Sequence, residues 1–404
     1  MEKEKEKRRI RIPFIPNFIY ATAALIHVRL HYHIKIDRKV LNKQKRGSII
    51  IYNHSSNKDQ FFVKAGVGFK RVNYVLARYF YYNHFLAFFL NWARAISKDQ
   101  FKPDIIAIRK MKRVVEAKGH VMIAPAGQIT IDGTIPYIPE SLVKLIKICD
   151  CDVLAMQMRG IYLSFPKWRK SKRKCKNVSL TFSKVLEKEE LKQLSDEEIY
   201  ERLVNSVSVN EYELQKTDPW PIKGDELTKG LEDLLVKCPK CGAKHSFKSL
   251  GNTLVCDKCN TFIKMNEYGL LEFKDKEGLT FDNIHDWFVW QEDKIYEDFM
   301  KHPLLEMTGA MHTNLIKEDT LEYSGSGTVT LDLEGMHFKG NLYGEEKSID
   351  FNTKIMAQLP FDCGVRIDIP DMNNSYRFYP DNPNLIIDFV QIISHWNKIQ
   401  NNKN

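Results

Sequence analysis

A histidine and an aspartate five positions apart are the residues of this chain best placed to do chemistry. His54 and Asp59 follow an apolar run, Ser48 to Tyr52, that is typical of a buried strand. A histidine at the end of a strand, with a carboxylate just beyond it, can form a base that the carboxylate holds in place. Such a base can take the proton from an alcohol as that alcohol attacks a carbonyl carbon.

The spacing of this pair sets a geometric condition. Residues five apart on an unbroken helix lie about 140° apart around the axis and do not meet. His54 and Asp59 can pair only if Ser55 to Lys58 form a turn, and Ser, Ser and Asn suit a turn because their side chains bond to nearby backbone. The alternative is that His54 is an ordinary loop histidine and Asp59 a carboxylate at a helix start.

Four stretches resemble the signature blocks of the glycerolipid acyltransferases, the lysophosphatidic acid acyltransferase family. Asn53 to Asp59 is similar to the first block, Asn-His-x4-Asp. Ile123 to Gln128 is similar to the third block, and the second and fourth are placed, in the family's order, at Asn91 to Lys98 and Val153 to Gly160. The resemblance covers roughly residues 15 to 215, about half of the chain.

The resemblance implies an O-acyltransferase of phospholipid biosynthesis. Its acyl donor would be acyl-coenzyme A or acyl carrier protein, and its acceptor the hydroxyl of a lysophospholipid, above all 1-acyl-sn-glycerol-3-phosphate. His54 would be the general base and Asp59 would orient its ring. From the third block we expect Pro125, Gly127 and Gln128 at the substrate, with the backbone around Gly127 and the side chain of Gln128 stabilising the oxyanion.

Several positions depart from the family pattern, and these positions are ones that bind the acceptor in the family. The glutamate of the third block is Ala126 here and its arginine is Ile129, while Leu154 replaces the proline of the fourth block. The arginine of the second block corresponds to Arg94 or Lys98. We expect the acceptor phosphate to be held by cationic side chains near the site, namely Lys58, Arg94, Lys98 and Arg159.

Charge and apolar patterning favour a membrane surface. The formal net charge of +10 suits anionic partners, although many soluble proteins are mildly basic for no particular reason. Phe14 to Ile26 is shorter than the ~20 residues that span a bilayer, so it predicts an amphipathic helix lying on or in the interface. Tyr79 to Trp92 fits such a helix or a buried core helix equally well. We expect a peripheral or monotopic protein on the cytoplasmic side of the membrane.

Four of the eight cysteines form two Cys-x-x-Cys pairs. The ligands Cys238, Cys241, Cys256 and Cys259 have the spacing of a zinc ribbon, in which four thiolates close a tetrahedral structural Zn²⁺ site. A pair of disulfides or a redox dithiol is the alternative. Because four protein ligands leave no open position, we expect this zinc to fold its module and not to catalyse.

The whole chain predicts an α/β acyltransferase-like mixed sheet with flanking helices, then the zinc ribbon, then a β-rich module that resembles a pleckstrin-homology domain and closes with a helix. Within the first of these, Leu186 to Gln215 predicts charged helices that wrap the domain. The expected boundaries are an N-terminal membrane-associating segment at 1–45, an acyltransferase domain at 46–216, a linker at 217–232, the ribbon at 233–275 and the C-terminal module at 278–404.

Two rival functions come from other classes. A zinc ribbon on a basic chain suits a nucleic-acid-binding protein, but the sequence has no obvious recognition helix or RNP-like aromatic strand, so no nucleic acid is expected. The altered third block suits a catalytically degenerate lipid-binding scaffold, against which the intact His54 and Asp59 count.

Overall fold

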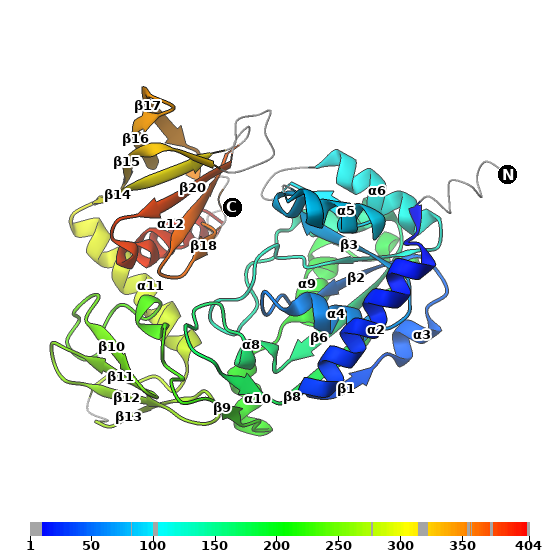
Figure 1. The fold of residues 1–404 in the computed structure, drawn as a ribbon, viewed down its shortest axis with the longest axis horizontal. Helices are drawn as coiled ribbons and strands as arrows, with labels where there is room; N and C mark the ends of the chain where they lie inside the picture. Colours follow the sequence, from blue (N-terminus) through cyan, green and yellow to red (C-terminus); the bar gives the residue numbers. More distant parts are fainter. Residues whose placement is uncertain are drawn as a thin grey trace. The chain divides into compact units, whose positions relative to one another are not determined.

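The structure, a computed structural model, describes residues 10–81, 83–99, 104–275, 278–313, 322–353, 356, 358–371 and 375–401. The chain divides into two compact units (Figure 1). The first comprises Met1–Pro166 and Lys174–Ile222, and the second comprises Lys167–Arg173 and Lys223–Asn404. Residues 1–9 of the predicted N-terminal segment and Tyr82 of the second apolar stretch lie outside the described residues.

A seven-stranded sheet forms the centre of the first unit, in the order β1-β8-β6-β2-β5-β3-β4. The strands β6, β2, β5, β3 and β4 run parallel, whereas β8 is antiparallel to β6 and pairs in parallel with β1. Parallel strands place their carboxyl ends at one edge of a sheet, which is where sites form in open α/β sheets. The strands are β1 (His33–Asp37), β2 (Ser48–Tyr52), β3 (Val72–Ala77), β4 (Ile96–Lys98), β5 (His120–Ile123), β6 (Asp152–Arg159) and β8 (Asn177–Leu186).

Helices cover both faces of this sheet, because β2 presents apolar side chains to both. Ile49 and Ile51 belong to one buried cluster and Ile50 to the other, as expected where successive side chains of a strand point to opposite faces. The first cluster is completed by α6 (Ile105–Glu116), α7 (Ser141–Cys149) and α9 (Asp196–Val207). The second is completed by α2 (Phe14–His31), α3 (Lys39–Lys43) and α4 (Asp59–Val67).

Two helices of the first unit leave large apolar side chains exposed. α2 buries Ala21, Ala24 and Val28, which lie on one helical face, and packs against α4. Its other face exposes aromatic and aliphatic side chains: Phe14, Ile15, Phe18, Ile19, Ile26 and Leu30. α5 (His84–Trp92) has no buried residue. None of the helices in the described part of the chain is both long and apolar enough to cross a membrane.

The mixed α/β architecture predicted for the first unit is confirmed. The apolar run Ser48–Tyr52 is β2. Apolar residues at helical spacing predict a helix over Asp104 to Lys118, and this helix is α6, whose start is capped by the Asp104 side chain as it accepts a hydrogen bond from the Ala107 amide. The charged stretch after Leu186 forms α9 and α10 (Glu211–Thr217), joined to shorter elements. The remaining short elements of this unit are η1 (Arg78–Tyr81), α8 (Ile161–Ser164), β7 (Lys174–Cys175) and η2 (Lys188–Lys192).

The second unit begins with a small antiparallel sheet in the order β10-β11-β12-β13 and continues into a larger one. The helix α11 (Ile284–Lys301) lies between them in sequence, and α12 (Ile386–Asn401) closes the chain. The small sheet comprises β10 (Phe247–Leu250), β11 (Thr253–Cys256), β12 (Phe262–Met265) and β13 (Leu271–Phe273). Short elements at and after the junction are β9 (Ile222–Lys223), η3 (Leu231–Asp233) and η5 (Pro383–Leu385).

The larger sheet confirms that the C-terminal part is β-rich, while its likeness to a pleckstrin-homology domain stays a prediction. Its order is β17-β16-β15-β14-β20-β19-β18. Alternation along Thr328 to Leu333 predicts that Val329, Leu331 and Leu333 share one face of a strand. Val329 and Leu331 are buried, but Leu333 is 61% exposed, because β15 ends at Asp332 and a turn follows. The strands are β14 (Leu304–Thr313), β15 (Glu322–Asp332), β16 (Met336–Leu342), β17 (Glu345–Phe351), β18 (Phe361–Asp362), β19 (Arg366–Pro370) and β20 (Ser375–Pro380).

Candidate functional site

His54 and Asp59 meet beyond the carboxyl end of β2. The His54 Nδ1 atom lies 2.7 Å from Asp59 Oδ2, and the same oxygen accepts a hydrogen bond of 2.7 Å from the Ser55 amide. The chain between them turns as the spacing required: the Lys58 amide donates to Ser56 Oγ, and the Asp59 amide to the Ser56 carbonyl. Asp59 is then the first residue of α4. The turn therefore brings the acid back onto the ring, which a continuous helix could not do.

The surroundings of this pair suit a base. Asp59 is buried, whereas the His54 side chain is 26% exposed. With Nδ1 turned to the carboxylate, Nε2 is the ring nitrogen left to accept a proton from a substrate hydroxyl. Among the described residues, Asp59 Oδ1 is buried without a hydrogen-bond partner. The carboxylate is thus committed to the ring and one amide, which is the arrangement needed to stabilise an imidazolium as it forms.

Asn53 positions this histidine, a role that sequence reasoning did not assign. Its side-chain amide donates to the Met158 carbonyl at 2.8 Å, and its Oδ1 accepts from the Met158 amide at 2.7 Å. In these two hydrogen bonds the Asn53 side chain takes the place of a backbone peptide group, so the pairing of β2 with β6 extends one step past the end of β2. This fixes the direction in which the chain leaves the sheet. The Thr130 amide bonds to the His54 carbonyl at 2.9 Å from the other side. An amide side chain directly before the histidine was the signal available in the sequence.

A small cleft lies beside His54, and most of its walls come from segments outside the predicted site. The loop after β5 supplies Thr130 and Gly133, α8 supplies Tyr162, and the start of α10 supplies Glu211. Gly133 has φ of 90°, and a Cβ there would lie 2.7 Å from the Tyr162 ring, so this close approach needs a glycine. The sequence contained no spacing signal for these residues, because they meet only when β5, β6 and α10 are brought together.

The residues of the third block form a turn at the end of β5, the strand beside β2. Gly127 is exposed with φ of 65°, and its amide donates to the Ala124 carbonyl at 3.1 Å. Pro125 and Gln128 flank it in the same turn and are half-buried. The structure thus places Pro125, Gly127 and Gln128 at the same edge of the sheet as His54, but they are not among the residues that line the cleft.

The predicted phosphate-holding side chains are dispersed around the first unit. Lys58 is exposed at the start of α4, and Lys98 ends β4, three strands from β2, or about 14 Å at ordinary strand spacing. The Arg94 carbonyl accepts from the Asn73 side chain near the beginning of β3, which is level with the beginning of β2. Arg94 therefore lies toward the edge of the sheet opposite His54.

Arg159 follows Met158, the backbone partner of Asn53, but its side chain is engaged elsewhere. Its guanidinium lies 3.7 Å from the centre of the Trp220 ring, and its Nη1 lies 2.7 Å from Asp218 Oδ2. It also donates to the Leu214 carbonyl at 3.1 Å. These contacts hold the C-terminal end of α10 in place. Arg159 therefore has a structural role, because its planar guanidinium both stacks on a ring and donates several hydrogen bonds. Among the described residues that line the cleft beside His54, there is no lysine or arginine.

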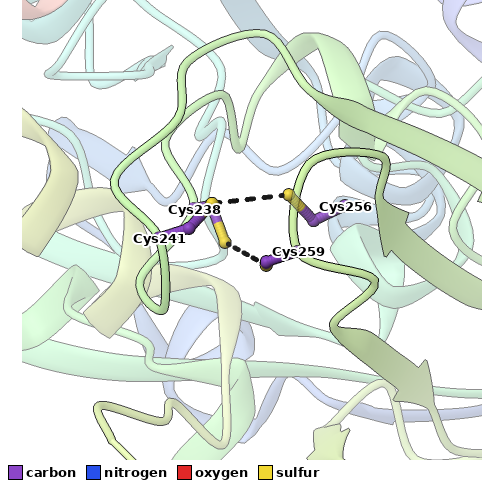
Figure 2. Close-up of side chains that lie close together, drawn as sticks. All are labelled: Cys238, Cys241, Cys256 and Cys259. Atoms are coloured by element: carbon purple, nitrogen blue, oxygen red, sulfur yellow. Dashed lines mark hydrogen bonds between the residues drawn. The ribbon is translucent and has the colours of Figure 1, made fainter.

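The four predicted metal ligands come together in the second unit, as Figure 2 shows. The Sγ atoms of Cys238, Cys241, Cys256 and Cys259 all lie within 4.8 Å of one another. Two Sγ–Sγ distances, Cys238 to Cys259 and Cys241 to Cys256, are 3.7 and 3.8 Å. A tetrahedral Zn²⁺ with Zn–S bonds of ~2.3 Å separates its sulfurs by about 3.8 Å, whereas a disulfide needs ~2.05 Å. The spacing of the cluster therefore fits a metal ion bound by four thiolates.

The backbone repeats one turn at both pairs of this cluster. The Gly242 amide donates to the Cys238 carbonyl and the Asn260 amide to the Cys256 carbonyl, at 3.0 and 2.9 Å. Both Gly242 and Asn260 have a positive φ, which glycine and asparagine tolerate best. Each Cys-x-x-Cys pair is thus a preformed knuckle that points two thiols at one centre.

Comparisons with known proteins found similarity among solved structures. No protein-family model matches the chain, and no curated protein matches it in sequence. Among solved structures, it is similar to the 1-acyl-sn-glycerophosphate (LPA) acyltransferase PlsC from Thermotoga maritima, with a TM-score of 0.40 and 14% sequence identity. The similarity covers 50% of this chain and 78% of that chain. A similarity of this size does not establish an activity.

Proposed function

We propose that the protein transfers a fatty acyl group from a thioester to the hydroxyl of a lysophospholipid. The observation that supports this best is the 2.7 Å contact between His54 Nδ1 and Asp59 Oδ2 at the carboxyl edge of the parallel sheet. It gives the signature from Asn53 to Asp59 the geometry of an oriented base. The donor is acyl-coenzyme A or acyl carrier protein, and 1-acyl-sn-glycerol-3-phosphate is the acceptor that the sequence resemblance names.

The proposed reaction needs one base and no covalent enzyme intermediate. His54 Nε2 takes the proton from the acceptor hydroxyl while the oxygen attacks the thioester carbon. The tetrahedral intermediate collapses, the carbon–sulfur bond breaks, and the imidazolium returns its proton to the departing thiolate. Asp59 stabilises the imidazolium between these two steps.

The oxyanion of the intermediate needs hydrogen-bond donors, and we place them in the turn of the third block. This turn lies at the end of β5, directly beside β2. The Gly127 amide already donates to the Ala124 carbonyl, so the donors we propose are other groups of the same turn, with the Gln128 side chain assisting. Pro125 shapes this turn.

The proposed location is the cytoplasmic side of an anionic membrane, held peripherally or in one leaflet. Exposed aromatic side chains on α5, including Phe85, Phe88 and Trp92, support this, together with the apolar outer face of α2. The net charge of +10 suits anionic lipids. The cysteine cluster would hold a structural Zn²⁺ with no chemical step, because all four positions are thiols.

A direct assay tests the proposal. Purified protein is incubated with labelled acyl-coenzyme A and lysophosphatidic acid or another lysolipid in vesicles, and both thiol release and the acylated lipid are measured. We expect acceptor-dependent thiol release that His54→Ala reduces by about 10²- to 10⁴-fold without loss of the folded state. Activity of His54→Ala within a few-fold of the wild type would refute the base, and absence of product with every acceptor would refute the reaction.

A further inference from the structure

Glu211 is a buried acid in the cleft beside His54 that the proposed reaction does not use. It is 2% exposed and is the first residue of α10. Asn210 caps this helix by accepting hydrogen bonds from the Tyr212 and Glu213 amides, which places Glu211 at the helix start. Glu211 and His54 both line the cleft. A molecule bound in this cleft would therefore lie beside both residues.

Only half of the Glu211 carboxyl group is engaged. Its Oε1 accepts a hydrogen bond of 2.7 Å from the Gly160 amide, just beyond the end of β6. Its Oε2 is buried without a hydrogen-bond partner among the described residues. Because the Gly160 contact holds the carboxyl in place, Oε2 is an acceptor with a fixed position. Buried polar atoms nearly always have a partner, so an orphaned carboxyl oxygen on a residue that lines a cleft is evidence that a bound molecule supplies the donor.

The electrostatics of the cleft select the kind of donor. Burial raises the pKa of Glu211 to about 7, against the opposing influence of the Gly160 amide and the more distant Arg159 guanidinium. Near neutral pH the side chain is thus either a carboxylate or a neutral acid, and both accept a hydrogen bond through a free oxygen. A phosphate monoester would meet this acid with no lysine or arginine among the described lining residues to offset repulsion.

We propose that Glu211 Oε2 accepts a hydrogen bond from a hydroxyl or ammonium group of the acyl acceptor, so that the preferred acceptor is a lysolipid with such a donor in its head group and not a phosphate monoester. The proposal rests on the acyl transfer proposed above and replaces the phosphate monoester that the sequence resemblance names as acceptor by a lysolipid with a donor in its head group.

A panel of four sn-1-acyl lysolipids with one acyl chain tests this on the full-length wild-type protein. The head groups are glycerol, which offers hydroxyls; ethanolamine, which offers an ammonium; choline, which offers no donor; and a bare phosphate monoester. With acyl-coenzyme A as donor, we expect kcat/KM for the glycerol or the ethanolamine lipid to exceed both others by about 10- to 100-fold, the worth of one hydrogen bond to a charged group. The better of the two identifies the donor as hydroxyl or ammonium.

Two variants assign this preference to Glu211. Glu211→Gln keeps an oxygen for the Gly160 amide but replaces the second oxygen by an NH₂ donor, so it should remove the preference, measured as the ratio of kcat/KM for the favoured lipid to kcat/KM for the choline lipid. Glu213→Gln is the matched control, since Glu213 is exposed on the same helix and pairs with Lys216. It should keep the wild-type preference. Circular dichroism and thermal melting establish that both variants are folded.

The possible outcomes distinguish a failure of the Glu211 proposal from a failure of the proposed acyl transfer. Transfer that depends on His54 but favours the phosphate monoester, or a preference that Glu211→Gln leaves unchanged, overturns the role of Glu211 alone. Absence of transfer to all four lipids overturns the proposed function and the acceptor together. If Glu211→Gln does not fold, the wild-type panel still decides, because a preference for the phosphate monoester contradicts the proposal by itself.

Discussion

The His54 site of the first unit and the cysteine cluster of the second satisfy their polar atoms in opposite ways. At the cluster, all four thiols face one another within 4.8 Å, and no ligand position is left over for a substrate. Around His54, two buried carboxyl oxygens, Asp59 Oδ1 and Glu211 Oε2, have no partner in the described structure, and the imidazole is partly open.

This difference shows how a folded chain separates stability from chemistry. Where the protein supplies all the ligands of a metal ion, the free energy of metal binding stabilises the fold and no position is left for a substrate. An open set leaves acceptors buried and unmet, at a cost of about 1–3 kcal/mol each, which the remainder of the core must offset. The orphaned oxygens near His54 therefore point to a site open to a ligand, in agreement with the contact between His54 and Asp59.

Loss of the metal should have the largest effect, because structural zinc supplies ~10–16 kcal/mol of folding free energy in small zinc modules. We expect Cys241→Ser to abolish stoichiometric zinc binding, measured by elemental analysis, and to remove the melting transition of the ribbon. Cys363→Ala, at a buried cysteine of the same unit outside the cluster, should keep one zinc per chain. Full zinc content in Cys241→Ser would show that the cluster is not the ligand set.

Asp59→Asn should lower kcat by about 10³-fold while the protein stays folded, because the imidazolium loses its counter-charge and the ring its tautomer. Steady-state kinetics at saturating acceptor measure the change. Asp37→Asn, an exposed carboxylate at the end of β1, is the matched control and should be silent. If kcat of Asp59→Asn stays within tenfold of the wild-type value, Asp59 does not assist His54 in the reaction.

Two buried groups of the first unit should make its stability depend on pH in opposite directions. Glu211 has a folded pKa of about 7, above its unfolded value of 4.5, so its contribution is lost as pH rises from about 4.5 to 7. His120 has its pKa lowered by burial from 6.5 to about 4, so its contribution is lost as pH falls from about 6.5 to 4. Each effect is worth about 3 kcal/mol at most.

Urea unfolding across this pH range separates the two contributions. In the wild type they oppose each other, so the free energy of unfolding should change little between pH 4.5 and 6.5. In Glu211→Gln it should rise with pH, because only His120 remains. In His120→Asn it should fall with pH. Identical slopes in the wild type and Glu211→Gln would show that Glu211 is not buried as an acid.

Asn53→Ala should have the smallest effect. It removes both hydrogen bonds to the Met158 backbone, so we expect a loss of about 2 kcal/mol in the free energy of unfolding. The catalytic groups remain but are held less firmly, and kcat should fall about tenfold. Asn91→Ala on exposed α5 is the control. If kcat is unchanged while stability falls, Asn53 supports the fold alone.

Local pattern predicted the elements that carry their own signals. The run of β2, the apolar spacing of α6 and the two Cys-x-x-Cys knuckles are each encoded within short stretches of the chain. The positions of Arg94 and Arg159 were not predictable in this way. Their partners, Asn73, Trp220 and Asp218, lie on other elements, and only the crossover connections decide which side chains they meet.

The amino-acid sequence by itself determined the strand before His54, the turn-forming residues that return Asp59 to it, and four thiols in the spacing of one metal site, because these depend on interactions between neighbours in the chain. The tertiary structure alone decided that Glu211, more than 150 residues later, lines the same cleft. That position follows from the order of β2 and β6 and from the Gly160 amide that holds the carboxyl. Contacts of this kind join residues remote in sequence, and no local pattern records them.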